Sequence, residues 1–287
     1  PEAEEALRIE AEISGTLFPG TRFVLPWARE NTGLRTRLGL EPVPADVVDR
    51  MCLELKDALV QAAPFLKRLT TLELRRRGKP EFSVRCERDE EAGEILIDTN
   101  GTTHIWKRLK ADFAGEAATL RGRYGATIEA KRKAEIIVAV PLDGMNQIGR
   151  LYATLPSEDE LKLPVLINAD FYPSSDRKRI LFSQDYQGEW NRAAIRAAAM
   201  ALSKSLPMLR KSLRPAELWA LLNAAKDLQR FSEEGGVDAV FDSFWKRIAP
   251  TLRDGAFVYT SARGWSLPSE VCLLQSAKEE ALIVPLL

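Results

Sequence analysis

Strand-like and helix-like stretches occupy separate blocks of this chain, and this segregation limits the fold more than any single motif does. Between residues 70 and 182, short runs rich in β-branched and aromatic residues alternate with turn residues, a pattern typical of strands. From residue 187 to about 248, apolar residues recur every three or four positions, as on one face of a helix. The separation predicts an α+β protein, with mixed or antiparallel sheets and helices packed against them.

The strand block divides into a polar and an apolar half. Its first half holds four runs, 70–77, 81–89, 93–99 and 103–113, joined by turn residues that include the hairpin pair Asn100-Gly101. These runs predict an antiparallel meander with one polar face. The second half holds more uniformly apolar runs at 134–142, 149–156 and 163–171. Such runs predict central strands of a sheet that is covered on both sides.

Helices are expected at both ends of the strand block. An apolar stripe predicts a helix from Ala45 that ends near Pro64. Further helices are expected over 189–206, over 215–231 with Pro215 in the first turn, and over 237–248. Short strands are expected at 256–260 and 270–275. A hairpin or closing strand is expected at 16–28, and a linker near 30–44.

Composition excludes several classes of protein. The chain has 287 residues, and its 41 basic and 41 acidic side chains cancel, so the net charge does not attract polyanions. Three widely separated cysteines fit a reducing compartment, and a single histidine excludes multi-histidine metal sites. No apolar run is long enough to span a membrane, so a cytoplasmic location is expected. The chain begins at Pro1, which suggests a fragment of a longer protein.

Motifs for stand-alone nucleotide or acyl-transfer chemistry are missing. The sequence contains no G-x-x-x-x-G-K-S/T loop, no G-x-G-x-x-G after a strand and no G-x-S-x-G elbow. The acidic run at 87–94 lies at an expected hairpin tip, where a solvated turn is favoured over a metal site. Basic residues at 72–80 and 107–110 lie on neighbouring expected strands, and the zero net charge and the absence of interleaved aromatic residues favour a solvated sheet face there over a nucleic-acid patch.

The stretch "LPVLINADFYPSSDRKRILF", residues 163–182, joins an apolar strand to a basic loop. Pro173 ends the strand ladder, and Ser174, Ser175 or Asp176 can cap the turn that follows. Arg177 and Arg179 then project from a short loop, and guanidinium groups suit phosphate oxygens because they donate two parallel hydrogen bonds. The alternative is a capped turn with solvated charges.

Several segments in the same order resemble sacsin-type proteins, in which an ATPase domain like that of heat-shock chaperones precedes a region of this design. The most specific similarity is L-P-V-x-I-N-x-x-F-x-x-S-S-x-R, from Leu163 to Arg177. The segments that carry the resemblance are "GTRFVLPW" (20–27), "DALVQAAPFLKRLTTLEL" (57–74), "IIVAVPL" (136–142), "GRLYATLPSEDELKLPVLINADFYPSSDRKRILF" (149–182), "QGEWNRAAI" (187–195) and "GWSLPSEVCLL" (264–274).

The resemblance implies that this chain acts beside a nucleotide that is bound in a pocket of another domain. In that family the pocket is of the GHKL class, marked by E-x-x-x-N-x-x-D-A and D-x-G-x-G, and neither occurs here. The parent protein is then expected to bind ATP and magnesium, while this chain holds no cofactor. In the ninety-kilodalton heat-shock chaperones, a middle-region arginine near a serine reaches the terminal phosphate. The matching positions are Arg177, or Arg179, with Ser174 and Ser175 as nucleotide-binding candidates.

The resemblance also implies a division of the chain. Residues 1–32 would hold the last strands of a truncated ATPase domain plus a linker, 33–212 a middle α+β domain, and 213–287 a smaller, truncated C-terminal segment. The expected function is a transducer that couples nucleotide state to conformational change or to client binding, with no activity alone. The alternatives are a protein-interaction module, suggested by Trp190, Trp219, Trp245 and Trp265, and a nucleic-acid-associated transducer, against which the net charge argues.

Overall fold

The computed structural model describes residues 33–66, 68–76, 79–144 and 148–271. The chain divides into two compact units, residues 1–55 and 56–287. The first unit contains α2 (Gly33–Arg37) and the start of α3 (Ala45–Ala62), which continues into the second unit. The strand expected at 16–28 lies outside the described residues, and so does most of the strand expected at 270–275. The proposed domain boundaries at residues 32 and 212 stay predictions.

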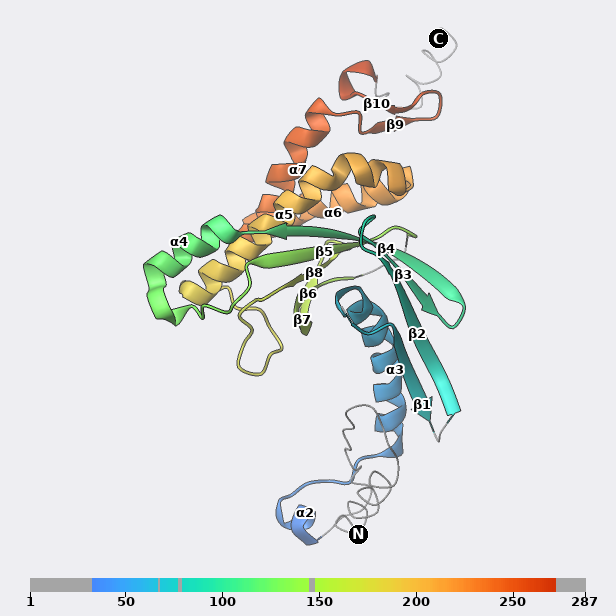
Figure 1. The fold of residues 1–287 in the computed structure, drawn as a ribbon, viewed down its shortest axis with the longest axis vertical. Coiled ribbons are helices and arrows are strands. Elements are labelled where there is room, and N and C mark those ends of the chain that lie inside the picture. The colour runs from blue at the N-terminus through green and yellow to red at the C-terminus, as the bar shows by residue number, and fades with distance from the viewer. Residues whose placement is uncertain (1–32, 67, 77–78, 145–147, 272–287) are drawn as a thin grey trace. The chain divides into compact units, whose positions relative to one another are not determined.

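The second unit is built on an eight-stranded mixed sheet, which confirms the α+β class (Figure 1). The strand order is β1-β2-β3-β4-β5-β8-β6-β7. All neighbouring strands are antiparallel except β6 and β8, which are parallel. The strands are β1 (Thr71–Arg76), β2 (Lys79–Asp89), β3 (Glu94–Thr99), β4 (Thr102–Asp112), β5 (Glu135–Pro141), β6 (Gly149–Ala153), β7 (Leu155–Leu161) and β8 (Leu166–Ala169).

The predicted meander is confirmed as β1 to β4. Asn100 and Gly101 connect β3 to β4, and their φ angles of 52° and 90° are those that a tight hairpin loop requires. The predicted central position of the apolar runs is also confirmed, because β5, β8 and β6 each have a strand on both sides. The run from Leu163 forms a shorter strand than expected, since β8 begins only at Leu166.

The helices follow the strands as predicted, with α5 (Tyr186–Ser212), α6 (Pro215–Glu233) and α7 (Asp242–Asp254). Pro215 occupies the first turn of α6, where its missing N–H costs no hydrogen bond. A final hairpin pairs β9 (Val258–Thr260) with β10 (Gly264–Ser266). None of the helices that the structure describes is both long enough and apolar enough to cross a bilayer.

Two α-helices and two strands were not expected from the sequence: α2, which lies within the expected linker near 30–44, and α4 (Ala114–Tyr124), together with β7 and β10. The helix α4 buries only Ala117 and Leu120, so its apolar stripe is too short to produce a clear period. The strand β7 contains Pro156 and three acidic residues, a composition that resembles a loop. It lies at the edge of the sheet and pairs only with β6, and an edge position tolerates proline and charge.

Hydrophobic cores lie on both faces of the sheet. The larger core joins the strands to α4, α5, α6 and α7, and it includes Val138, Ile167 and Leu202. In Figure 1, α5 lies across the sheet, where it packs on β4 and β5. The smaller core covers the opposite face, where Phe65 packs against the ring of Tyr152 at a centroid distance of 4.8 Å. The chain that leaves β8 is therefore anchored in a sheet that is packed on both faces.

Candidate functional site

The basic loop, residues 173–180, is a closed turn at the end of the segment that follows β8. Its ends are joined by a β-bridge between Pro173 and Ile180. Inside the bridge, the backbone N–H of Ser174 donates to the carbonyl of Arg179 at 2.8 Å. The N–H of Arg177 donates to the carbonyl of Ser174, also at 2.8 Å. These bonds define the path of the backbone through the whole loop.

Side chains inside the basic loop complete the turn. The Ser174 hydroxyl donates to Asp176 Oδ1 at 2.5 Å and accepts from the N–H of Arg179 at 3.0 Å. Asp176 Oδ1 also accepts from the N–H of Lys178 at 3.1 Å. The hydrogen bond from Ser174, and to a smaller extent that from Lys178, holds the pKa of Asp176 below its usual value. Of the three alternative capping residues, Ser174, Ser175 and Asp176, the structure shows Ser174 and Asp176 in this role.

The second turn of α5 holds both ends of the basic loop through buried side chains. Asn191 is completely buried, and its Oδ1 accepts from the N–H of Tyr172 at 2.8 Å. Its Nδ2 donates to the carbonyls of Tyr172 at 2.8 Å and Leu181 at 2.7 Å. Trp190 adds a bond from Nε1 to the carbonyl of Asp170 at 3.0 Å. One amide side chain therefore ties the segments on either side of the loop together.

The next residue, Arg192, holds the chain after the loop. Its Nη1 donates to the carbonyl of Ser183 at 2.9 Å, its Nη2 also contacts the carbonyl of Phe182, and it forms an ion pair of 2.7 Å with Asp238. Gly188 allows α5 to lie close to the backbone of Ser183, because a Cβ at this position would be 1.9 Å from the carbonyl oxygen of Ser183. We call Trp190, Asn191 and Arg192 the α5 clamp.

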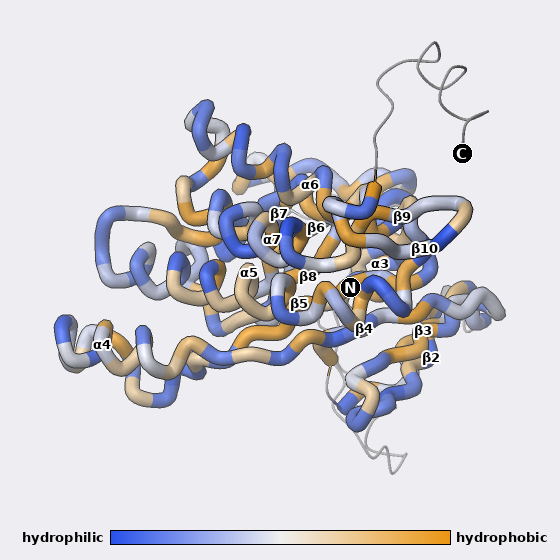
Figure 2. Tube along the Cα trace, turned by 90° about the horizontal axis from the view of Figure 1, so that it is seen from above, coloured by the Kyte–Doolittle hydropathy of each residue, from blue (hydrophilic) through white to orange (hydrophobic). Residues whose placement is uncertain are grey.

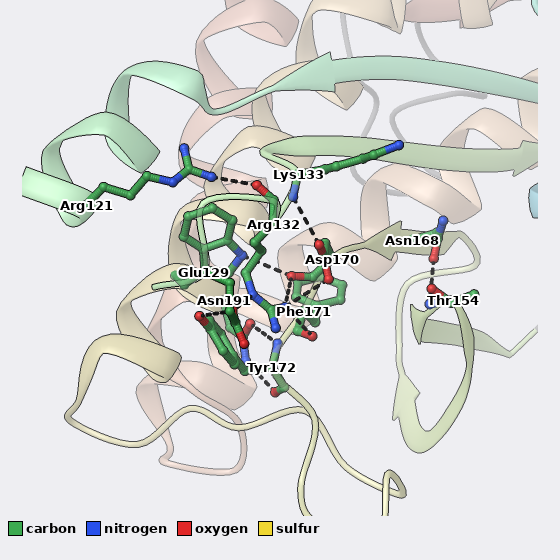
Figure 3. Close-up of polar contacts among 11 residues, drawn as sticks. Arg121, Glu129, Arg132, Lys133, Thr154, Asn168, Asp170, Phe171, Tyr172 and Asn191 are labelled. Carbon is green, nitrogen blue, oxygen red and sulfur yellow. Dashed lines mark hydrogen bonds and ion pairs between the residues drawn. The ribbon is translucent and has the colours of Figure 1, made fainter. Parts of the chain in front are cut away.

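A second arginine supports the strand side of the loop (Figure 3). Arg132 Nη1 lies 2.9 Å from both the carbonyl and the Oδ1 of Asp170, and its guanidinium stacks 3.6 Å from the ring centre of Tyr172. Its Nε donates to Glu129 at 2.8 Å. Hydrogen bonds from Arg132 and Tyr172 lower the pKa of Glu129 to about 2, despite some loss of hydration. Burial, and then the bond to Glu129, raises the pKa of Tyr172 to about 12.

Strand β7 fixes the third side of the loop and neutralises one of its cations. The N–H of Glu158 donates to the carbonyl of Lys178 at 2.6 Å, and the N–H of Ile180 donates to Asp159 at 2.6 Å. The ammonium of Lys178 forms an ion pair of 2.9 Å with Glu158. Of the three basic side chains in the loop, Lys178 is thus compensated within the protein.

Arg177 and Arg179 differ from Lys178 in this respect. Both are exposed, and neither guanidinium makes an ion pair or hydrogen bond to a residue that the structure describes. Arg177 has a φ of 59°, a left-handed conformation that is uncommon outside glycine. The sequence prediction of two arginines on a short, positioned loop is therefore confirmed as geometry.

A hollow of about 230 Å³ opens beside Arg177. Its polar lining includes Arg132, Ser157 and Asp170, and it also contains Thr154, whose φ of 71° is unusual for a β-branched residue. The N–H of Thr154 is held by Asn168 Oδ1 at 3.2 Å. Strained backbone conformations tend to cluster at functional sites, and two of them meet at this hollow.

The other predicted site residues lie on the same loop with different surroundings. Ser174 uses its hydroxyl within the turn, whereas Ser175 is exposed. The supporting residues Arg132, Asp159 and Asn191 were not singled out from the sequence. The segment "QGEWNRAAI", which contains the α5 clamp, was one of the segments quoted for the family resemblance, and that was the available signal.

Comparison with known proteins assigns no family: no protein-family profile, curated protein or solved structure matches this chain. Within the described residues, no group of three histidine, cysteine or acidic side chains is arranged to hold a metal ion. The site therefore has to be interpreted from its own chemistry, as a held loop that presents two uncompensated guanidinium groups.

Proposed function

We propose that this chain is the middle, or transducer, region of a sacsin-like, chaperone-type GHKL ATPase of the cytoplasm. ATP and magnesium would be bound by a neighbouring N-terminal ATPase domain. This chain would have no hydrolytic activity alone. It would contribute an arginine to the terminal phosphate of the nucleotide and couple the state of that nucleotide to conformational change or client binding.

The observation that carries the proposal is the contrast within the basic loop. An ordinary surface loop does not require a fully buried asparagine that makes three hydrogen bonds to its two ends, as Asn191 does here. Here the backbone is held from three sides, while Arg177 and Arg179 remain uncompensated. Guanidinium groups without an internal partner keep all of their N–H donors for hydrogen bonds to phosphate oxygens. Such an arginine stabilises transition-state charge only after domains close, and this couples hydrolysis to conformation.

Between the two arginines, the geometry favours Arg177. Its left-handed conformation places it at the hollow shared with Thr154, whereas the backbone N–H and carbonyl of Arg179 are both used to close the turn. Arg179 remains the second choice.

The test is nucleotide hydrolysis by the full-length parent protein. Arg177→Ala is expected to lower kcat by about a hundredfold or more, with a smaller effect on nucleotide affinity. The matched control is Lys178→Ala, since it removes a neighbouring cation that is already paired with Glu158. Unchanged hydrolysis in both the Arg177→Ala and Arg179→Ala proteins would remove the phosphate role.

A protein-interaction module is the second candidate, and one observation favours it. Trp219 on α6 is 39% exposed, whereas Trp190 is fully buried, and Trp245 and Trp265 are half-buried against the core. Exposed tryptophan is enriched at protein interfaces. If this role holds, Trp219→Ala should reduce suppression of the aggregation of reduced lysozyme by the parent, measured by light scattering, without changing ATP hydrolysis. Equal suppression by the variant would count against it.

A nucleic-acid role has the least support. The cations of the 107–110 segment are compensated, because Lys107 pairs with Glu94 while Arg108 and Lys110 pair with Glu90. Salt-dependent binding to a labelled DNA duplex in anisotropy measurements would revive this alternative.

A further inference from the structure

Strand β4 is paired over only part of its length on each side, with β3 over residues 102–107 and with β5 over residues 106–112. On the β3 side, the ladder begins with the pair of Glu94 and Lys107, so that β5 is the only described strand that pairs with residues 108–112, although the N–H of Arg108 still bonds to the turn before β3. In Figure 2 the chain runs from α4 along β4 at the margin of the sheet, and no described strand lies outside this part. Residues 108–112, here called the β4 edge, thus form an open strand edge.

The direction of the free backbone groups follows from one hydrogen bond. The N–H of Arg108 donates to the carbonyl of Gly93 at 2.8 Å, so the backbone groups of Arg108 point away from β5. In an antiparallel ladder this direction alternates with every residue. Lys110 and Asp112 therefore also point their N–H and C=O groups outward, where no described backbone group pairs with them.

Hollows lie on both faces of the β4 edge. On the α5 face, a hollow of about 590 Å³ runs between β4 and α5. A second hollow, of about 350 Å³, includes Arg108, Lys110 and Ile137, which lie on the face of the smaller core. Successive side chains of an added strand point to opposite faces, so consecutive residues would enter the two hollows in turn.

The edge lacks the charge that usually discourages strand addition. An exposed lysine normally protects an edge strand, but the ammonium of Lys110 is paired with Glu90 at 2.7 Å. Hydrogen bonds from Lys110 and Arg108 lower the pKa of Glu90 to about 2, so this compensation persists over the physiological pH range.

The α5-face hollow selects for negative charge. Besides Arg108 and Lys110, whose side chains lie on the opposite face, the residues that line it include four basic and two acidic ones. Arg196 is paired with Glu116, whereas Lys204 and Arg247 make no ion pair with any residue that the structure describes. Leu109, Met200 and Met208 supply apolar surface between these cations. A carboxylate side chain on an apolar stem matches both properties.

We propose that the β4 edge is a docking site for an extended, acidic peptide segment of another protein, which adds as an outer strand beside residues 108–112. Main-chain hydrogen bonds to Lys110 and Asp112 would supply affinity, and acidic side chains above Lys204 and Arg247 would supply selectivity. Binding of this peptide involves no nucleotide, so a test of it is independent of the proposed function.

The probe is a fluorescein-labelled peptide of alternating glutamate and valine, titrated into the full chain and followed by anisotropy. Lys110→Pro removes the outward N–H but no bond to β5, so it should weaken binding by about tenfold or more. The control Lys110→Ala loses the same charge and keeps the N–H, and it should bind within about threefold of wild type. Circular dichroism of both variants checks that the sheet is intact.

Two further measurements separate edge pairing from simple charge attraction. The double variant Lys204→Glu, Arg247→Glu should weaken binding by about tenfold, while Lys226→Glu on the exposed face of α6 should not. The peptide should also slow hydrogen exchange at the Lys110 and Asp112 amides. Absence of binding to wild type, or equal binding by Lys110→Pro, would overturn the proposal. Self-association of wild type that Lys110→Pro abolishes would overturn it too, because the occupant would then be a second copy.

Discussion

Asn191 and Tyr172 exchange two hydrogen bonds of 2.8 Å, so that a side-chain amide takes the place of a neighbouring β-strand. The same amide reaches the carbonyl of Leu181 on the far side of the basic loop. A group that belongs to α5 thus supports the two ends of the loop, which the Pro173–Ile180 bridge and a backbone bond from Leu181 to Tyr172 also join. The orientation of Arg177 and Arg179 depends on this contact.

Removal of the Asn191 amide should destabilise the protein strongly. Asn191→Ala leaves the N–H of Tyr172 and the carbonyl of Leu181 without the amide that they bind in a buried site, and the carbonyl of Tyr172 keeps only its bond from the N–H of Leu181. We expect a loss of about 3 kcal/mol in the free energy of unfolding, measured by urea denaturation. Hydrogen exchange across 173–180 should also become faster. The control Asn223→Ala, at an exposed position on α6, should change stability by about 0.5 kcal/mol or less.

Two helical glycines should respond to alanine in opposite directions. Gly188→Ala places a methyl group 1.9 Å from the Ser183 carbonyl, so the clamped segment has to shift. We expect a loss of about 2 kcal/mol or more. Gly115→Ala in α4 meets no atom within 4 Å and should stabilise the protein by about 0.5–1 kcal/mol, because alanine is the better helix former. Thermal unfolding of the two variants measures both effects, and equal melting temperatures would contradict the packing described here.

Glu129 should make the protein sensitive to acid. Its pKa falls from an ordinary value of about 4.5 to about 2 in the folded state. The carboxylate is therefore stabilised by folding. This contribution is complete above about pH 4.5 and is lost as the pH falls toward 2. Glu129→Gln should remove this part of the decline in urea stability between neutral and acidic pH. Glu91→Gln is the control, since its side chain makes no ion pair or hydrogen bond to a described residue, and an identical pH profile for Glu129→Gln and wild type would refute the prediction.

Ser174 and Ser175 should be distinguishable by the titration of Asp176. The Ser174 hydroxyl is the main reason for the lowered pKa of this carboxylate. Ser174→Ala should therefore raise the pKa of Asp176 toward its usual value, whereas Ser175→Ala should leave it unchanged. Carbon-13 NMR of the carboxyl group during an acid titration measures the change directly. A shift of equal size in both variants would show that Ser174 does not hold the turn.

Local patterns were sufficient for the elements whose stability is local. The Asn100-Gly101 pair predicts its hairpin because few other residues adopt two positive φ angles in succession. The uniform hydrophobicity of β5 and β8 predicts central strands because both faces are covered. The same reasoning failed for β7, where three acidic residues and a proline form a strand only because β6 offers its edge.

The sequence by itself determined the α+β class, the meander and the presence of two arginines on a short loop after a strand. Only the tertiary structure decided which charges are free, because ion pairing depends on residues distant in the chain. Glu158 on β7 neutralises Lys178, while Arg177 has no such partner among the described residues. It also decided that β4 has an open edge, since this depends on where β3 begins and not on any pattern within β4. Contacts of this kind follow from the packing of separate elements, which local periodicity does not encode.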